Sequence, residues 1–397
     1  MNAYSDARGA FLPATHPRIA PVARAKPSGA TVLELLEGRR ICICAGSGGV
    51  GKTTVSAAVA MGMAARGLRV AVVTIDPARR LANSLGLDEL DNEPRRVDPR
   101  RFAAHGVELQ GELWAMMLDA KRTFDDLIGR LAPDERTRDE VLSNRIYAEL
   151  SSAVAGSQEF TAIAKLYELD RDGGFDLIVL DTPPSRNALD FLDAPGRLTH
   201  FFQGRALKVL LRPAGIGGRL VGRGTGMVFS ILKRVTGVDL MEDLSVFFRS
   251  LGGMVDGFTE RAGRVGALLV DPETTFLLVT SPQRDPVDEA IFFHRKLAAA
   301  GMPFGGLVVN RVQAPGGRPP EGLEDELGES LAARVALSAR ELDVLARRDR
   351  ANIERLDREL GGPPRIEIPE LDADVHDVPG LARLQEHLFG TAPVAVA

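Results

Sequence analysis

The clearest chemistry in the sequence belongs to a glycine-rich segment that fits G-x-x-x-x-G-K-[ST], namely Gly46-Ser47-Gly48-Gly49-Val50-Gly51-Lys52-Thr53, followed by Thr54. Glycines at these positions let backbone N–H groups point inward around phosphate oxygens. Lys52 would neutralise the β- and γ-phosphates, and the Thr53 hydroxyl would coordinate Mg²⁺. The pattern predicts a site for a nucleoside triphosphate and Mg²⁺; the alternative is a glycine-rich turn that binds no nucleotide.

Two aspartates are placed to complete this site. Asp181 follows the apolar run 177–180, and Asp76 follows the apolar run 70–75. Because the carboxyl ends of parallel strands meet at one edge of a sheet, we expect both carboxylates beside the phosphate loop. We interpret Asp181 as the residue that holds the Mg²⁺ shell together with Thr53. Either aspartate taken alone could instead cap a helix.

A phosphate loop needs a strand before it and a helix after it, and the sequence supplies both. The apolar run 41–45 precedes the loop, and the helix-forming run 54–66 follows it, so that the helix N-terminus adds partial positive charge. Further β-branched runs alternate with helical patterns at 68–76, 113–119, 175–181, 275–280, 305–310 and 365–368. This alternation predicts an α/β fold of the P-loop NTPase kind, with a doubly wound, mostly parallel sheet.

The chain has 397 residues, enough for one large α/β domain with insertions. Residues 1–30 contain four prolines and no apolar core, which predicts a flexible tail. We interpret 31–397 as a single P-loop domain with an inserted helical subdomain, formed by insertions at about 120–170 and 186–270. An apolar helix face within 240–258 either receives a client protein or packs the subdomain core, and its spacing fits both.

The overall composition excludes several classes of function. The chain has 49 basic and 54 acidic residues, a net charge of −5 and no basic block, which argues against a dedicated nucleic-acid binder. The least charged stretch, 41–65, is broken by glycines and contains Lys52, so no membrane span is predicted. The N-terminus has no signal-peptide core, and we expect a cytoplasmic protein. Cys42 and Cys44 lack further soft ligands, which predicts buried thiols and no structural zinc.

With these motifs, the sequence resembles the arsenite-pump and tail-anchored-protein-targeting ATPases, within the deviant Walker A group that also contains the Min and Par ATPases. The matching segments span about residues 40 to 385. They are the phosphate loop 46–54, Asp76-Pro77-Ala78 with Leu81 as switch I, Asp181-Thr182-Pro183-Pro184-Ser185 as switch II, Leu307-Val308-Val309-Asn310, and Ile366-Glu367-Ile368-Pro369.

The resemblance implies ATP as the nucleotide and Mg²⁺ as the cofactor, with Asp76 as the carboxylate that orients and activates the attacking water. It also implies that Asn310 contacts adenine and that Pro369 belongs to the adenine-lining turn. The chain has no Asn-Lys-x-Asp motif for guanine, so we expect ATP to bind better than GTP. The resemblance further implies a face-to-face dimer that closes on ATP.

The sequence departs from the family pattern in three places. The family's signature lysine, which reaches across the dimer, is Ser47 here. Switch II reads Pro-Pro-Ser-Arg-Asn at 183–187, where the targeting ATPases usually carry Ala-Pro-Thr-Gly-His. The cysteines of zinc-clasped members and of arsenite sensors are absent, so arsenite pumping is not expected, because a soft metalloid needs thiolates. Arg79, Arg80 and Arg186 are the nearest cations by motif that could replace the missing lysine.

Three kinds of function follow from these observations. The leading hypothesis is a Mg²⁺-ATP-dependent dimeric ATPase whose nucleotide cycle opens and closes a helical surface for a hydrophobic client segment or a membrane-protein partner. The alternative, supported by Ser47, is a low-turnover ATP-binding regulatory subunit in a heterodimer with a paralogous ATPase. A positioning ATPase acting on DNA or membrane is opposed by the acidic composition and by a C-terminus, 378–397, without a basic amphipathic anchor.

Overall fold

The computed structural model describes residues 30–76, 79–145, 157–182, 254–317 and 322–390, together with residues 147, 247, 250 and 252. The predicted N-terminal tail lies outside the described residues except for Ala30. Most of the predicted insertion at 186–270 also lies outside them, as do Arg186 and the part of switch II from Pro183 onward. The expectations for these segments stay predictions.

Eight strands form one sheet in the order β3-β4-β2-β5-β1-β6-β7-β8. Every neighbouring pair is parallel except β3 with β4. The predicted mostly parallel α/β fold is therefore confirmed. The strands are β1 (Ile41–Ala45), β2 (Arg69–Thr74), β3 (Arg95–Arg96), β4 (Glu112–Met117), β5 (Leu177–Asp181), β6 (Thr274–Thr280), β7 (Phe304–Val312) and β8 (Arg365–Pro369).

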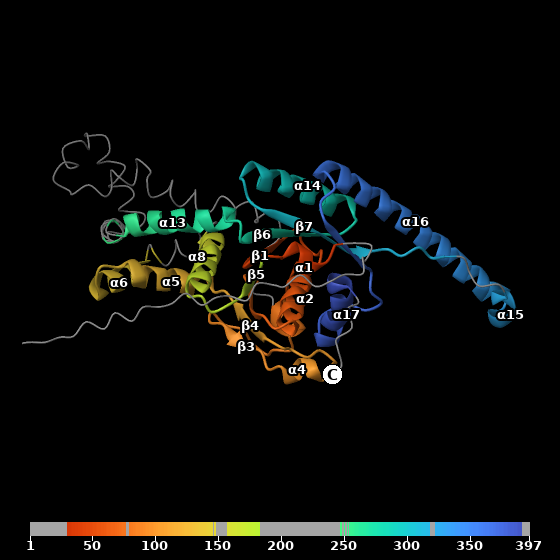
Figure 1. Cartoon of the computed structure of the whole chain (residues 1–397), viewed down its shortest axis with the longest axis horizontal. Helices are drawn as coiled ribbons and strands as arrows, with labels where there is room; N and C mark the ends of the chain where they lie inside the picture. Colours follow the sequence, from red (N-terminus) through yellow and green to blue (C-terminus); the bar gives the residue numbers. More distant parts are fainter. Residues whose placement is uncertain are drawn as a thin grey trace, which may run out of the picture.

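Helices cover both faces of the sheet, as Figure 1 shows. One apolar layer joins α1, α2 and α17 to the sheet, and the other joins α5, α8, α13, α14 and the C-terminal half of α16. The helices are α1 (Val32–Leu35), α2 (Lys52–Ala65), α3 (Arg80–Ser84), α4 (Arg100–Ala103), α5 (Ala120–Leu131), α6 (Glu135–Leu142), α8 (Ser157–Arg171), α13 (Val255–Val270), α14 (Arg284–Ala299), α15 (Leu323–Leu327), α16 (Glu329–Leu360) and α17 (Val378–Phe389).

The central strands β1 and β5 determine where the site lies. Both are buried along their whole length, as expected for parallel strands covered on two faces. The strand register places Asp181 between Cys44 in β1 and Thr74 in β2. The chain leaves β1 for one half of the sheet and leaves β5 for the other half. The carboxyl ends of these strands therefore flank a topological switch point, where open α/β sheets bind ligands.

Several element boundaries differ from those that the sequence patterns predict. β2 ends at Thr74, so Asp76 lies two residues beyond the strand rather than at its end. α2 begins at Lys52 rather than at Thr54. β7 continues to Val312, so Asn310 lies inside it. The antiparallel β3 has only two residues, which is too short to produce a periodic pattern.

The described part of the helical region packs its apolar side chains inward. Phe247, Met254 and Phe258 are at most 4% exposed and belong to the core around α5, α8 and α13. For these residues the core interpretation holds. Glu168 on α8 also forms ion pairs with Arg130 on α5 and Arg261 on α13. No helix among the described residues is long and apolar enough to cross a membrane.

Candidate active site

The glycine-rich loop connects β1 to α2, as the sequence predicts. The N-terminal end of α2 adjoins the loop and contributes partial positive charge there. A side chain at Gly46 would collide with the carbonyl group of Val279, and one at Gly51 would collide with the side chain of Asn310. Gly51 also has a φ of 93°, which favours glycine. The loop is thus packed closely against the ends of β6 and β7.

Lys52 is buried next to the carboxylates of the site. Its Nζ donates a hydrogen bond of 2.7 Å to the carbonyl oxygen of Ser47. Burial lowers the pKa of Lys52, whereas the nearby charges of Asp181 and Asp76 raise it. The ammonium group is therefore held over its own loop, where a phosphate would offer a stronger, charged acceptor than the carbonyl of Ser47.

Asp181 ends β5 and is 1% exposed. Its Oδ2 accepts hydrogen bonds from the hydroxyls of Thr53, at 2.7 Å, and Thr74, at 2.9 Å. Its Oδ1 is buried and accepts no hydrogen bond from the residues that the structure describes. Burial raises the pKa of Asp181 to about 6, although the two hydroxyls and Lys52 oppose this shift.

The surroundings of Asp181 fit a Mg²⁺ site. A buried carboxylate oxygen without a donor is costly, and a bound cation would offset that cost. Carboxylate and hydroxyl oxygens are also suitable ligands for this hard cation. Asp181 and Thr53 would hold the ion, as predicted from the sequence. Thr74 is an additional residue of the site, because its hydroxyl also accepts the backbone N–H of Asp76 at 3.2 Å.

Asp76 is partly exposed and forms an ion pair with Arg80, with 3.7 Å between Oδ2 and Nη1. Both residues line the pocket at the phosphate loop. Arg79 instead pairs with Glu89 at 3.2 Å and lines a separate cavity of about 180 Å³. Arg186 lies outside the described residues. Among the arginines considered as substitutes for the missing lysine, Arg80 is thus the one that the structure places in this pocket.

A pocket of about 500 Å³ brings the predicted phosphate and base residues together. This volume lies within the range of sites that bind small molecules. The segment 370–376, which follows β8, forms a further wall that the motifs do not indicate. The predicted site residues that line the pocket are Gly49, Gly51, Lys52, Thr53, Thr54, Asp76, Asn310 and Pro369.

Asn310 contacts the phosphate loop directly, since its Nδ2 donates a hydrogen bond of 2.8 Å to the carbonyl of Val50. The next residue, Arg311, has a φ of 62°, which is uncommon for a residue other than glycine. Its guanidinium donates to the carbonyl of Gly49 at 3.4 Å and lies 3.9 Å from Asp374. Arg311 has no sequence signature, because its unusual backbone conformation is a property of the folded chain.

The raised pKa of Asp181 predicts a pH-dependent difference in stability between the wild type and Asp181→Asn. The carboxyl ionises near pH 3.8 in an unfolded chain and near pH 6 in the folded protein. Between these values the unfolded state loses a proton that the folded state keeps, so stability falls as pH rises. The wild type should therefore lose about 2 kcal/mol relative to Asp181→Asn between pH 4 and pH 7.

Chemical denaturation of both proteins in EDTA, at several pH values, measures this difference. Asp88→Asn, at an exposed position, serves as the control and should follow the wild type at every pH. Parallel stability curves for the wild type and Asp181→Asn would contradict the assignment. Addition of Mg²⁺ and nucleotide should stabilise the wild type more than the variant, since ligand binding to the folded state adds to its stability.

Comparisons with known proteins find relatives that are named as ATPases. The model of the anion-transporting ATPase family matches residues 39–317. The putative arsenical pump-driving ATPase 1 of Aquifex aeolicus is 22% identical over 359 residues, covering 89% of this chain and 80% of the relative. ATPase GET3C of Arabidopsis thaliana is 26% identical over 351 residues, covering 86% and 80%. ATPase ARSA2 of Chlamydomonas reinhardtii is 26% identical over 305 residues, covering 75% and 73%.

Proposed function

The chain belongs to the family of anion-transporting ATPases, and from this premise we propose that it is a cytoplasmic, Mg²⁺-dependent ATP hydrolase that works as a dimer. The observation that carries the proposal is the pocket in which Lys52, Thr53 and Asp76 converge with Asn310. Asp181 lies behind the pocket lining and accepts a hydrogen bond from Thr53, which lines the pocket. These residues together provide a binding site for phosphate, a binding site for a cation, and a carboxylate, that of Asp76, which can orient a water molecule.

Hydrolysis proceeds by in-line attack of a water molecule on the γ-phosphate. Asp76 orients this water, and Lys52 with the backbone N–H groups of the loop stabilises the charge on the phosphate oxygens. Mg²⁺, when bound, neutralises charge on the β- and γ-phosphates. Thr74 positions the two carboxylates relative to each other, because it donates to Asp181 and accepts from the backbone of Asp76.

The helical region is the proposed surface for a hydrophobic client segment or a membrane-protein partner. α8 precedes β5, whose last residue is Asp181, so one buried strand connects the helical region to the cation site. The ion pairs of Glu168 with Arg130 and Arg261 then link α8 to α5 and α13. Copurification of the native protein with and without ATP and Mg²⁺ identifies what binds. Recovery of the same proteins under both conditions would contradict nucleotide control.

Ser47 favours a second candidate function, a low-turnover ATP-binding subunit in a heterodimer with a paralogous ATPase. The side chain of Ser47 is 6% exposed, and its Oγ has no hydrogen-bond partner in the part of the chain that the structure describes. A serine supplies no positive charge to a neighbouring active site. The partner subunit, which retains the lysine, would then provide the cation that this chain lacks.

Replacing Ser47 with lysine should raise the ATPase rate of the isolated protein by about tenfold or more, because a positioned cation greatly stabilises the phosphoryl-transfer transition state. The measurement is steady-state phosphate release at saturating ATP. Ser47→Met is the control for side-chain size and should not raise the rate. Fast turnover by the wild type that is lost in Arg80→Gln would instead assign the cation to Arg80.

A further inference from the structure

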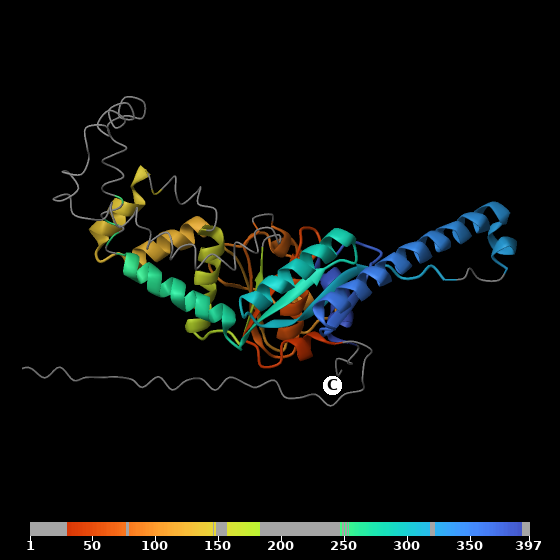
Figure 2. The same ribbon diagram turned by 90° about the horizontal axis from the view of Figure 1, so that it is seen from above.

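The longest helix among the described residues, α16, is packed against the sheet along only part of its length. In α16, Asp349, Ile353 and Leu356 are at most 1% exposed. Asn352 donates a 2.8 Å hydrogen bond to the carbonyl of Pro282, and Glu359 pairs with Arg295 on α14. Towards its N-terminus, α16 extends beyond the sheet and the helices that cover it (Figure 2). We call residues 323–348, which comprise α15 and the outer part of α16, the arm.

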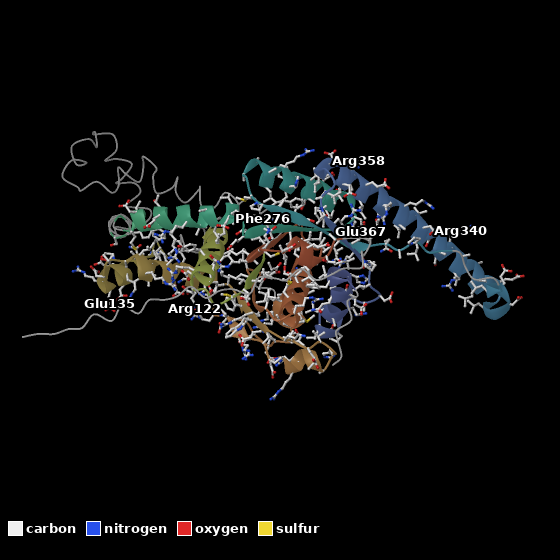
Figure 3. The ribbon with its side chains drawn as sticks, in the orientation of Figure 1. Arg122, Glu135, Phe276, Arg340, Arg358 and Glu367 are labelled. Atoms are coloured by element: carbon white, nitrogen blue, oxygen red, sulfur yellow. The ribbon has the colours of Figure 1, made fainter. Side chains whose placement is uncertain are left out.

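The arm projects from the edge of the sheet that carries the nucleotide pocket. After β7 the chain runs outward along α16, since Gln313 donates a backbone N–H to Asp349 and Gly316 donates one to Asp343, each at 3.0 Å. Figure 2 shows α15 and the outer part of α16 extending away from the other layers, and Figure 3 places Arg340 along this extension. The arm's part of α16 has 20 residues, 329–348, and is about 30 Å long.

The arm carries most of the exposed large apolar side chains. Eight such side chains are found among the described residues, and six of them lie between positions 327 and 344. Three of the six, Leu331, Val335 and Leu342, share one face of α16, and exposed apolar side chains gathered on one face mark an interaction surface. One stripe along α16 has the alternating spacing of four and three residues that is typical of coiled coils. It consists of Leu331, Val335, Ser338, Leu342 and Leu345.

The two flanks of this stripe differ. On one flank, Ala332 and Ala339 are buried, and Gly316, in the segment that runs outward from β7, packs against Ala339 and covers part of that side. The other flank carries Arg334 and Glu341, seven residues apart and both exposed. Neither forms an ion pair with another described residue of this chain. When two copies of such a helix run in opposite directions, their apolar stripes face each other and the basic residue of each copy lies beside the acidic residue of the other.

We propose that the arm pairs with the arm of a second copy of this chain, as an antiparallel two-helix coiled coil. Leu331 lies opposite Leu342 of the second copy, and the same register brings Arg334 beside Glu341 on the shared flank, twice by symmetry. A parallel pair would bring Arg334 next to alanines and would place the acidic tips, Glu324 and Asp325, beside each other. Charge complementarity therefore selects the antiparallel orientation.

This pairing is separate from the nucleotide-dependent dimer proposed above, because it uses no residue of the pocket. It should therefore form without ATP and Mg²⁺. Permanent dimers commonly bury roughly 1,200–2,000 Å² or more, and one short helical pair buries less. The association should accordingly be reversible and should depend on protein concentration.

Cysteine cross-linking of the full-length protein tests the orientation in EDTA without nucleotide. The native cysteines Cys42 and Cys44 are buried and do not compete. With a short bismaleimide, a mixture of Leu331→Cys and Leu342→Cys chains should cross-link at least about fivefold more than either variant alone, since equivalent positions lie about 16 Å apart in the antiparallel pair. Cross-linking of each variant alone, but not in the mixture, would overturn the antiparallel arrangement.

Charge reversal tests the contacts by sedimentation. Arg334→Glu and Glu341→Arg should each weaken self-association about tenfold, because each places like charges together. The double variant restores opposite charges and should return to within about threefold of the wild type. A merely structural role of these residues would not produce rescue. A wild-type chain that stays monomeric without nucleotide at every concentration would overturn the proposal and assign the stripe to a different protein.

Discussion

Asp76→Asn should lower the ATPase rate by at least about 100-fold while ATP binding changes less than about threefold, as expected when a positioned catalytic carboxylate loses its charge. Asp76 lines the same pocket as Lys52 and Thr53. It follows the carboxyl end of β2, however, and is not part of the phosphate loop. Its proposed role is to orient the attacking water. An amide keeps the size of the side chain and removes its ability to accept a proton.

The measurements are steady-state hydrolysis and calorimetric titration with a non-hydrolysable ATP analogue. Asp88→Asn is the matched control, because Asp88 is an exposed carboxylate in the segment that follows α3. It should keep both properties of the wild type. Wild-type turnover in Asp76→Asn would remove the role assigned to switch I but would leave the phosphate-loop assignment unchanged.

Lys52→Ala should reduce ATP affinity by roughly 100-fold or more, because a charge-assisted contact to the phosphates is lost from a desolvated position. The variant should nevertheless fold. Burial lowers the pKa of Lys52, which means that the ammonium is held in the folded protein at a cost. Truncation relieves this desolvation cost but also removes the hydrogen bond to Ser47 and a positive charge beside Asp181, so thermal unfolding without nucleotide is measured beside binding.

Lys296→Ala is a suitable control, since it removes a lysine from α14, away from the pocket-lining residues. Its ATP affinity should equal that of the wild type. Calorimetry on both variants, with thermal unfolding in parallel, separates loss of binding from loss of folding. Unchanged ATP affinity in Lys52→Ala would show that the glycine-rich loop does not bind the phosphates.

The sequence predicts the sheet well because its signals are local. The buried strands β1 and β5 read as continuous apolar runs, and the glycine-rich segment between β1 and α2 is recognised from its own spacing. The order of these elements implies the mostly parallel sheet. The two-residue β3 gives no such signal, because it is defined only by its pairing with β4.

The candidate site was predictable only in part. Motifs identify Lys52 and the two aspartates, since each follows a strand or a glycine-rich turn. Thr74 cannot be recognised in the same way, because its importance depends on the register that places it beside Asp181. The contact of Asn310 with Val50 joins residues 260 positions apart in the chain, so no local pattern reports it.

The sequence by itself determines the chemistry available to this protein: a phosphate loop, two carboxylates and a serine in place of the family's lysine. Tertiary structure decides how these groups are used. The low dielectric around Asp181 raises its pKa to about 6, an effect that depends on how the strands and helices cover it. Likewise, the apolar spacing along α16 is the same whether the helix lies against the core or projects from it. Only the folded chain shows that Ile353 and Leu356 face the sheet, while Leu331 and Leu342 remain exposed for another surface.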